Sequence, residues 1–591
     1  MDNFNKMQLN FILLTAVFMF YLFNCLGWHQ GAVKKISRPY SLASLKKAPP
    51  YPGKILSGTA KASHRAAAGA MRSILNEKVS RSALAAKGTL KLIAVRCEFA
   101  LETGNPLITG DGKASLSAAA VSANLDKLKN YYSKASYGAL SLSIDLAGQV
   151  FELPKKMSQY GSGGDAPAVV KSLVSDLVSV SSLDPAAGRS DASKYIDYSS
   201  YDAVIAIHAG VGEESDVAGG GAGDTPDDIW SMAFDDLNIT LANGGILNYA
   251  IVVPESEAQD NNGENGPAGV MCHEFGHLLG LPDLYDADNS SLGAGAWDLM
   301  GYGAWRDNGN SPCMISSWSM IQLGYLTPVE VVSNAASLSV AALSDSPAAL
   351  KVYASSKEKN KNEYFLVENR QKKGVDSFIE GGGILIWHID DAAGSVESNN
   401  VNADETHKRV DLESAEGLDS SNKDRLDYNA AGTKPMSDKD PFYAGYKTVL
   451  DAWSNPSSMS YNMTDAPVSI EVLSPKNDIM NVKIGVDNKE TPSGVQISKT
   501  YFYPNPVSDG FGKIYYFTAF KPDEVKIKIF DRNRRTVLSA DHFGRKGHNE
   551  FGWNLADDNL NEVPNGTYFY KITAKSAAGE AEKTGKIAVL R

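Results

Sequence analysis

The feature that most constrains this 591-residue chain is one short apolar segment, residues 270–286, which reads VMCHEFGHLLGLPDLYD. It contains two histidines and three acidic residues, and such groups are costly on a buried helix unless a partner pairs with them. His273 and His277 are four residues apart, so on a helix they project from one face, one turn apart. That separation lets two imidazoles bind one Zn²⁺ ion.

The residues after the second histidine indicate where the helix ends. Gly280 can adopt the positive φ that terminates a helix, and Pro282 prevents the helix from resuming. The chain then turns and brings Asp283 toward the metal as the predicted third ligand, with Asp286 or a water as the alternative. Glu274 lies beside the histidines, where it can act as a general base on the attacking water. The pattern is H-E-x-x-H-x-x-G-x-x-D.

A second motif follows at a fitting distance. The stretch AWDLMGYG places Met300 seventeen residues after Asp283 and Tyr302 two residues further on. Metzincin proteases have a methionine turn beneath the zinc, and several have a tyrosine at this offset that reaches the metal or the oxyanion. A lone methionine is usually a core residue. Together with the helix motif, the pattern predicts Met300 as a structural turn residue and Tyr302 as an oxyanion stabiliser.

Several stretches resemble the immune inhibitor A-like secreted metalloproteases. They are HEFGHLLGLPDLYD, WDLMGYG, SPCMISSWSMIQLGYLTP, YYSKASYGALSL, YDAVIAIHAGVGEE, EYFLVENRQ and GGGILIWHID. The resemblance covers roughly residues 89–450. It implies a secreted zinc endopeptidase made as a zymogen, acting on extracellular proteins or peptides. The alternative is a surface adhesin whose metalloprotease core is inactive, but the presence of Glu274 argues against it.

Acidic residues also cluster just after the helix motif. Asp286, Asp288 and Asn289 form a loop rich in oxygen ligands, which Asp298 could join. Ca²⁺ prefers such oxygens and would make the loop rigid. Solvated loop acids explain the same pattern equally well, so both interpretations stay open.

The periodicity of the chain predicts an α+β multidomain protein. Strands and helices in βαβαββ order precede the histidine-rich helix and indicate a metzincin-like α/β catalytic domain over 89–330. Short turn-bounded strands then indicate a β-sandwich domain over 331–486. Residues 487–497 are a polar linker, and 498–591 are predicted to form a separate immunoglobulin-like β-sandwich.

The C-terminal module has resemblances of its own. YPNP, WNLADDNLNEVPNGTYFYKI and the ending GKIAVLR are similar to sorting domains read by type IX secretion systems. They are also similar to immunoglobulin-like modules of the flagellar-hook-cap type. Both resemblances imply that bacterial secretion machinery is a partner and that the protein is secreted or held at the outer cell surface.

The N-terminal residues fit an exported protein. Lys6 precedes an apolar run that suits a signal peptide over 1–27 but is short for a membrane span. Residues 28–88 carry twelve Lys or Arg and the single acid Glu77, and they are predicted to be a pro-segment, with a linker as the alternative. The net charge of −12 argues against a nucleic-acid partner. The three cysteines left after signal cleavage cannot form a disulfide framework.

Overall fold

The computed structural model describes most of the chain after residue 82. The described ranges are 83–161, 166–215, 225–258, 266–354, 362–418, 423–429, 433–452, 454–461, 468–486, 495–503, 505–508 and 510–590. The predicted signal peptide, residues 28–82 of the predicted pro-segment and most of the linker lie outside these ranges. Within them, no helix has the length and apolar character needed to cross a membrane.

A mixed sheet organises the region that contains the histidine motif. Its order is β2-β1-β3-β7-β4, and only the pairing of β4 with β7 is antiparallel. The strands are β2 (Leu140–Glu152), β1 (Gly88–Glu98), β3 (Ala203–Val211), β7 (Ala250–Ser256) and β4 (Met232–Phe234). Before β7 the structure also has the short strand β6 (Ile246–Leu247). The predicted βαβαββ order is observed, with short strands added between β3 and β7.

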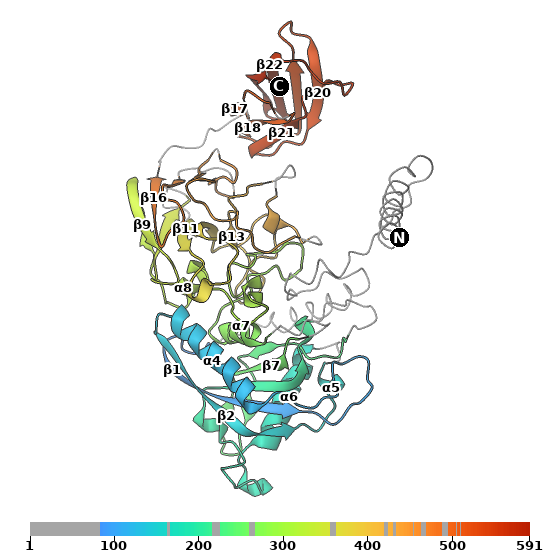
Figure 1. Ribbon diagram of the computed structural model, residues 1–591, viewed down its shortest axis with the longest axis vertical. Coiled ribbons are helices and arrows are strands. Elements are labelled where there is room, and N and C mark those ends of the chain that lie inside the picture. The colour runs from blue at the N-terminus through green and yellow to red at the C-terminus, as the bar shows by residue number, and fades with distance from the viewer. Residues whose placement is uncertain are drawn as a thin grey trace, which may run out of the picture. The chain divides into compact units, whose positions relative to one another are not determined.

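Helices cover both faces of this sheet (Figure 1). Alternate residues of β1 belong to two cores, with Leu92 in one and Ile93 in the other. The first core also contains residues of α4 (Ala118–Ala135) and α7 (Ala268–Leu278), and the second contains residues of α6 (Ala166–Ser181). Since side chains alternate across a strand, α4 and α7 lie on one face and α6 on the other.

Two further sheets follow the first. One has the order β13-β12-β11-β10-β8, and the other has the order β14-β15-β16-β9. Buried residues from both sheets share one core, as the β-sandwich prediction requires. Their strands are β8 (Val329–Glu330), β9 (Ala335–Ala341), β10 (Ala349–Tyr353), β11 (Glu363–Arg370), β12 (Gly383–Asp390), β13 (Val410–Leu412), β14 (Val449–Leu450), β15 (Val468–Val472) and β16 (Ile479–Val486).

The sheet containing β11 and β12 is buried on both faces. Every residue of these two strands is buried. Phe365 and Ile386 belong to the sandwich core, whereas Leu366 and Trp387 belong to the core that contains α4 and α7. Residues on both sides of the predicted boundary at residue 330 therefore contribute to one apolar core, in addition to the core that the sandwich has of its own.

The C-terminal module has a core of its own. It consists of the sheets β17-β18-β21 and β20-β19-β22-β23, whose buried residues form one cluster within 497–589. The strands are β17 (Ile497–Tyr503), β18 (Gly512–Thr518), β19 (Glu524–Phe530), β20 (Thr536–His542), β21 (Gly547–Trp553), β22 (Gly566–Ser576) and β23 (Gly579–Val589). This two-sheet arrangement agrees with the predicted β-sandwich.

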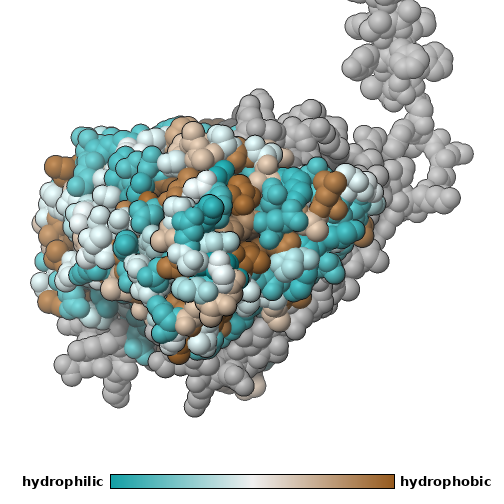
Figure 2. Space-filling model, turned by 90° about the horizontal axis from the view of Figure 1, so that it is seen from below, coloured by the Kyte–Doolittle hydropathy of each residue, from teal (hydrophilic) through white to brown (hydrophobic). Residues whose placement is uncertain are grey.

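The shorter elements complete the description. They are α5 (Ser158–Gly161), β5 (Ile239–Thr240), α8 (Ser317–Gln322) and the 3₁₀ turns η1 (Pro185–Ala187), η2 (Tyr198–Ser200), η3 (Glu213–Ser215), η4 (Tyr302–Trp305), η5 (Gly374–Asp376) and η6 (Arg425–Asp427). On the face seen in Figure 2, apolar side chains lie in small groups among polar ones. Apolar surface divided in this way is ordinary for a folded protein.

Candidate metal centre

The histidine motif lies on α7, which ends where the sequence predicts. The last helical residue is Leu278, and Gly280 has a φ of +97°, a conformation that residues with a Cβ rarely adopt. The carbonyl of Leu278 accepts a hydrogen bond of 2.8 Å from the backbone N–H of Leu84. The end of the predicted pro-segment therefore packs against the end of this helix.

Three side chains converge at this place. His273, His277 and Asp283 each offer one ligand atom, and these atoms all lie within 4.8 Å of one another. Asp283 Oδ1 is 3.0 Å from Nε2 of His273 and 3.3 Å from Nε2 of His277. The turn after Gly280 thus brings the acid back over the helix face that carries both histidines.

Backbone carbonyls fix the tautomer of each histidine. His273 Nδ1 lies 3.1 Å from the carbonyl oxygen of Leu299, and His277 Nδ1 lies 2.8 Å from that of Leu281. A carbonyl only accepts, so Nδ1 of each ring carries a proton and Nε2 of the neutral ring carries a lone pair. Both lone pairs then face Asp283. Metal-ligating histidines are typically oriented in this way.

The carboxylate oxygen that faces these lone pairs lacks a hydrogen bond. Asp283 Oδ1 is buried and has no hydrogen-bond partner. A buried carboxylate oxygen between two lone pairs is unfavourable without a positive charge. A set of two nitrogens and one oxygen fits Zn²⁺ and leaves a coordination position for a water or a substrate.

Burial and charge also perturb the acid and base strengths of this site. Burial lowers the pKa of His273, but the negative charge of Asp283 outweighs it and raises that pKa to about 9 in the absence of a metal. Burial raises the pKa of the Glu274 carboxyl to about 7, against the opposing effect of the two histidines. Glu274 is 8% exposed, so the pocket keeps it largely out of water.

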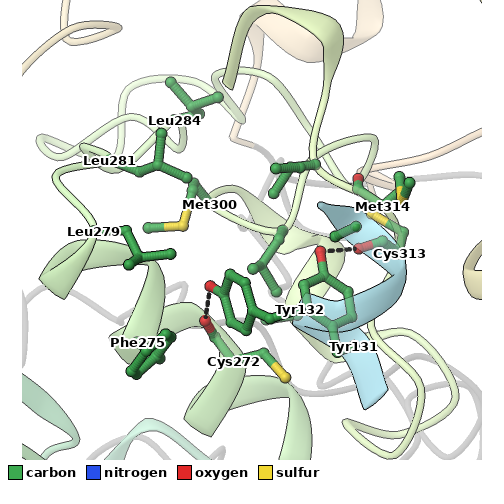
Figure 3. Packing of buried hydrophobic residues seen from close by; sticks show 14 of the residues in the cluster. Tyr131, Tyr132, Cys272, Phe275, Leu279, Leu281, Leu284, Met300, Cys313 and Met314 are labelled. Atoms are coloured by element: carbon green, nitrogen blue, oxygen red, sulfur yellow. Dashed lines mark hydrogen bonds between the residues drawn. The ribbon is translucent and has the colours of Figure 1, made fainter. Parts of the chain in front are cut away.

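Met300 packs directly under the helix. An added Cβ at Gly276, which lies between the two histidines on α7, would be 2.6 Å from Met300 Sδ. Figure 3 shows Met300 among Phe275, Leu279 and Leu281. A larger residue at position 276 would require the end of the Met300 side chain to move. The contact explains why a glycine occupies this position.

Buried hydrogen bonds hold the methionine turn in place. Asp298 Oδ1 accepts from the N–H of Met300 at 2.7 Å, and its Oδ2 accepts from the N–H of Ser316 and the hydroxyl of Ser319. The Met300 carbonyl accepts from the N–H of Leu284, next to Asp283 in sequence. Both carboxylate oxygens of Asp298 thus bind the methionine turn and the start of α8 rather than the acidic loop.

Two tyrosines lie near the ligands. The ring of Tyr285 stacks on His273, with ring centroids 6.2 Å apart and planes 16° apart. The ring of Tyr302, in η4, lies 6.3 Å from that of Tyr285, and its side chain is 2% exposed. The sequence motif predicts a role for Tyr302 but not for Tyr285, although Tyr285 is only two residues from Asp283.

The acidic loop after the motif uses its oxygens internally. Asp286 Oδ1 accepts from the N–H of Asp288, and its Oδ2 accepts from the hydroxyl of Ser290 and the N–H of Ser291. Asp288 in turn accepts from the N–H of Ser290. Such hydrogen bonds are typical of an acid that stabilises its own turn.

One contact of the site comes from far along the chain. Asn399, between β12 and β13, forms hydrogen bonds to both the backbone and the side chain of Asp283. The sequence reasoning missed this residue because nothing in the local pattern around 399 relates it to the histidine motif.

Comparisons with known proteins agree with this geometry. Residues 107–324 match the catalytic domain of the immune inhibitor A peptidase M6 family, and residues 501–587 match the secretion system C-terminal sorting domain family. The sorting domain supports a secreted or cell-surface location.

Two curated relatives align with the same part of the chain. The pre-pro-metalloprotease PrtV of Vibrio cholerae serotype O1 (strain M66-2) is 29% identical over 224 residues, which cover 33% of this chain and 23% of that protein. Immune inhibitor A of Bacillus thuringiensis subsp. alesti is 28% identical over 228 residues, which cover 32% of this chain and 31% of that protein. The alignments thus span less than a third of either relative.

Among solved structures, OgpA from Akkermansia muciniphila aligns over 88% of this chain and 97% of its own, with 12% identity and a TM-score of 0.22. A score this low does not assign a fold. The family matches do identify two parts of the chain: it carries an immune inhibitor A-type peptidase M6 catalytic domain and a secretion-system C-terminal sorting domain.

Proposed function

We propose that this protein is a secreted zinc endopeptidase that hydrolyses peptide bonds of extracellular proteins. The observation that carries the proposal is the meeting of two histidine lone pairs with the unpartnered Oδ1 of Asp283. Zn²⁺ held there would supply Lewis acidity toward the peptide carbonyl and toward water. The metzincin-like character of the domain belongs to this proposal and is supported by the methionine that packs under α7.

Glu274 is the proposed general base. It follows His273 on α7 and lies within the same buried site. Its carboxylate takes the proton of the attacking water and later delivers it to the leaving amine. The raised pKa of this carboxyl supports the second step, because a carboxyl with a pKa near 7 holds and releases a proton at neutral pH.

The oxyanion that develops on the substrate needs a donor. Tyr302 is the donor that the sequence indicates, and the stacking of Tyr285 on His273 makes it the alternative. A phenol stays protonated at neutral pH in either position and donates without changing charge. The Tyr302→Phe and Tyr285→Phe variants separate the two, because loss of the true donor should lower kcat more than it weakens substrate binding.

The export partner is proposed from the sorting domain, which the secretion machinery of the cell would recognise.

We do not extend the proposal to calcium, because the oxygens of Asp286 already accept hydrogen bonds from their own loop. The basic segment 28–88 is proposed to keep the enzyme latent. This segment is basic and contains a single acidic residue, whereas the rest of the chain is acidic, so the two are complementary in charge.

The decisive experiment is cleavage of casein or gelatin by the purified protein with and without a zinc chelator. We expect activity that the chelator abolishes and added zinc restores. Glu274→Gln should bind zinc with near-normal affinity but lose activity by at least about 10²–10⁴-fold. An inert wild-type protein that binds zinc would favour the adhesin alternative, and near-normal proteolysis by Glu274→Gln would exclude Glu274 as the base.

A further inference from the structure

Asn399 and Asp283 form a closed pair of hydrogen bonds. The backbone N–H of Asp283 donates to Asn399 Oδ1 at 2.7 Å. The Nδ2 group of Asn399 donates in return to Asp283 Oδ2. The two residues are 116 positions apart in sequence, so this ring of contacts connects the third-ligand turn to the loop between β12 and β13.

The chemistry of the pair fixes the orientation of the amide. A backbone N–H only donates, so the atom of Asn399 that faces it is the oxygen. The nitrogen of the same amide is therefore directed at the carboxylate. With Oδ2 of Asp283 engaged by this donor, Oδ1 is the oxygen left for the two Nε2 lone pairs, from which it lies 3.0 and 3.3 Å away.

The loop that carries Asn399 is built to hold the amide in place. Asn399 is 8% exposed and has a φ of +50°, which asparagine tolerates better than most residues. Its own N–H donates to the carbonyl of Val396. Three residues on, Asn402 donates to the carbonyls of Leu284 and Val410 and accepts from the N–H of Val410. The loop is thus anchored to the ligand turn at Asp283 and at Leu284.

We propose that Asn399 is a positioning residue for the metal: its amide holds Asp283 so that one oxygen alone faces the ion. The inference rests on the proposed zinc centre and adds that residues 331–486 complete it. An aspartate at 399 would set a second carboxylate against Oδ2, whereas the amide of asparagine offers an acceptor and a donor on separate atoms.

The test is direct zinc binding by the purified full chain, measured by competition with a chromophoric chelator. Asn399→Gly removes the amide and keeps a residue that accepts the positive φ. Loss of a residue that orients a ligand typically weakens metal binding by about 10–100-fold. We expect that loss in Asn399→Gly. The melting temperature of the metal-free variant is measured in parallel, so that unfolding is recognised.

Asn402→Ala is the matched control, because it loosens the same loop without touching a ligand side chain. We expect it to lower the melting temperature with and without zinc by similar amounts and to change zinc affinity less than about threefold. An unchanged zinc affinity in Asn399→Gly overturns the inference and leaves the zinc centre standing. So does an equal loss of affinity in both variants. A wild-type protein that binds no zinc overturns the zinc centre itself.

Discussion

Two β-rich regions follow the catalytic domain, and they differ in how their cores are built. The middle region, residues 331–486, contributes Leu366 and Trp387 to the core that also contains α7. The C-terminal module, residues 497–589, has its own two-sheet core and shares with the middle region a small cluster of Ala452, Met459 and Phe517. Two stretches that look alike in sequence therefore differ: the first shares a large core with the catalytic domain, and the second packs mainly on itself.

A buried ion network reinforces the middle region. Arg370 at the end of β11 is fully buried and bonds Asp376 through two nitrogens, Glu368 through a third contact, and the carbonyls of Trp297 and Met314. The last two residues flank the methionine turn in sequence. The middle region therefore holds the segment that underlies the metal centre, in addition to covering it.

The largest effect is expected from removing the middle region. A chain that ends at residue 330 would expose the apolar face that packs against Leu366 and Trp387 and would lose the donors of Arg370. We expect it to be insoluble or unfolded, as judged by circular dichroism and limited proteolysis. A folded 83–330 fragment with a cooperative thermal transition would show that the comparison is mistaken.

The next effect concerns one residue. Arg370→Met should lower the free energy of unfolding by about 3–5 kcal/mol, because it leaves Asp376 and Glu368 buried without their partner. Urea denaturation measures the change. The control is Lys571→Met in the C-terminal module, where the ion pair with Glu582 is on the surface. We expect no measurable change there, and a similar loss in both variants would count against the distinction between the regions.

Removing zinc should act on one region only. At a zinc concentration one hundred times Kd, the ion stabilises the folded form by about 2.7 kcal/mol. A chelator should therefore lower the calorimetric transition of residues 83–486 and leave that of the C-terminal module in place. Equal shifts of both transitions would mean that the two are coupled.

The smallest effect is expected from deleting residues 487–591. The free energy of unfolding of the remaining chain should change by less than about 1 kcal/mol, and cleavage of a short peptide by the purified enzyme should keep its kcat/KM. Export from the producing cell should fail, because the sorting domain is gone. A large loss of peptide cleavage would place part of the active unit in the module.

The features that the sequence predicted correctly depend on residues that are close together in the chain. The spacing of His273 and His277, the end of α7 at Gly280 and the alternation of β1 each depend on neighbouring residues, and each is observed. The runs EYFLVENRQ and GGGILIWHID were recognised as strands, but a buried strand does not reveal which surface covers it. The sequence therefore did not show that residues on both sides of the predicted boundary at residue 330 contribute to one core.

The parts of the site that were missed depend on contacts between distant residues. Asn399 reaches Asp283 only because the loop after β12 folds back onto the ligand turn, and no periodicity encodes that approach. Tyr285 had a local signal, its place two residues after Asp283, but a tyrosine there is also an ordinary core residue. The calcium site at Asp286 and Asp288 stays a prediction; composition does not show that the oxygens of Asp286 accept hydrogen bonds from their own turn.

The hydrogen bond from Leu84 to the carbonyl of Leu278 has a consequence for maturation. The last carbonyls of a helix need donors from outside it, and here one donor comes from the segment just before β1. Leu84 and Ala86 also pack against the apolar core around α7. A processing protease that trimmed beyond Leu84 would fray the helix end that carries His277. If residues 28–88 are the pro-segment proposed above, a cut that leaves these contacts intact lies before Leu84.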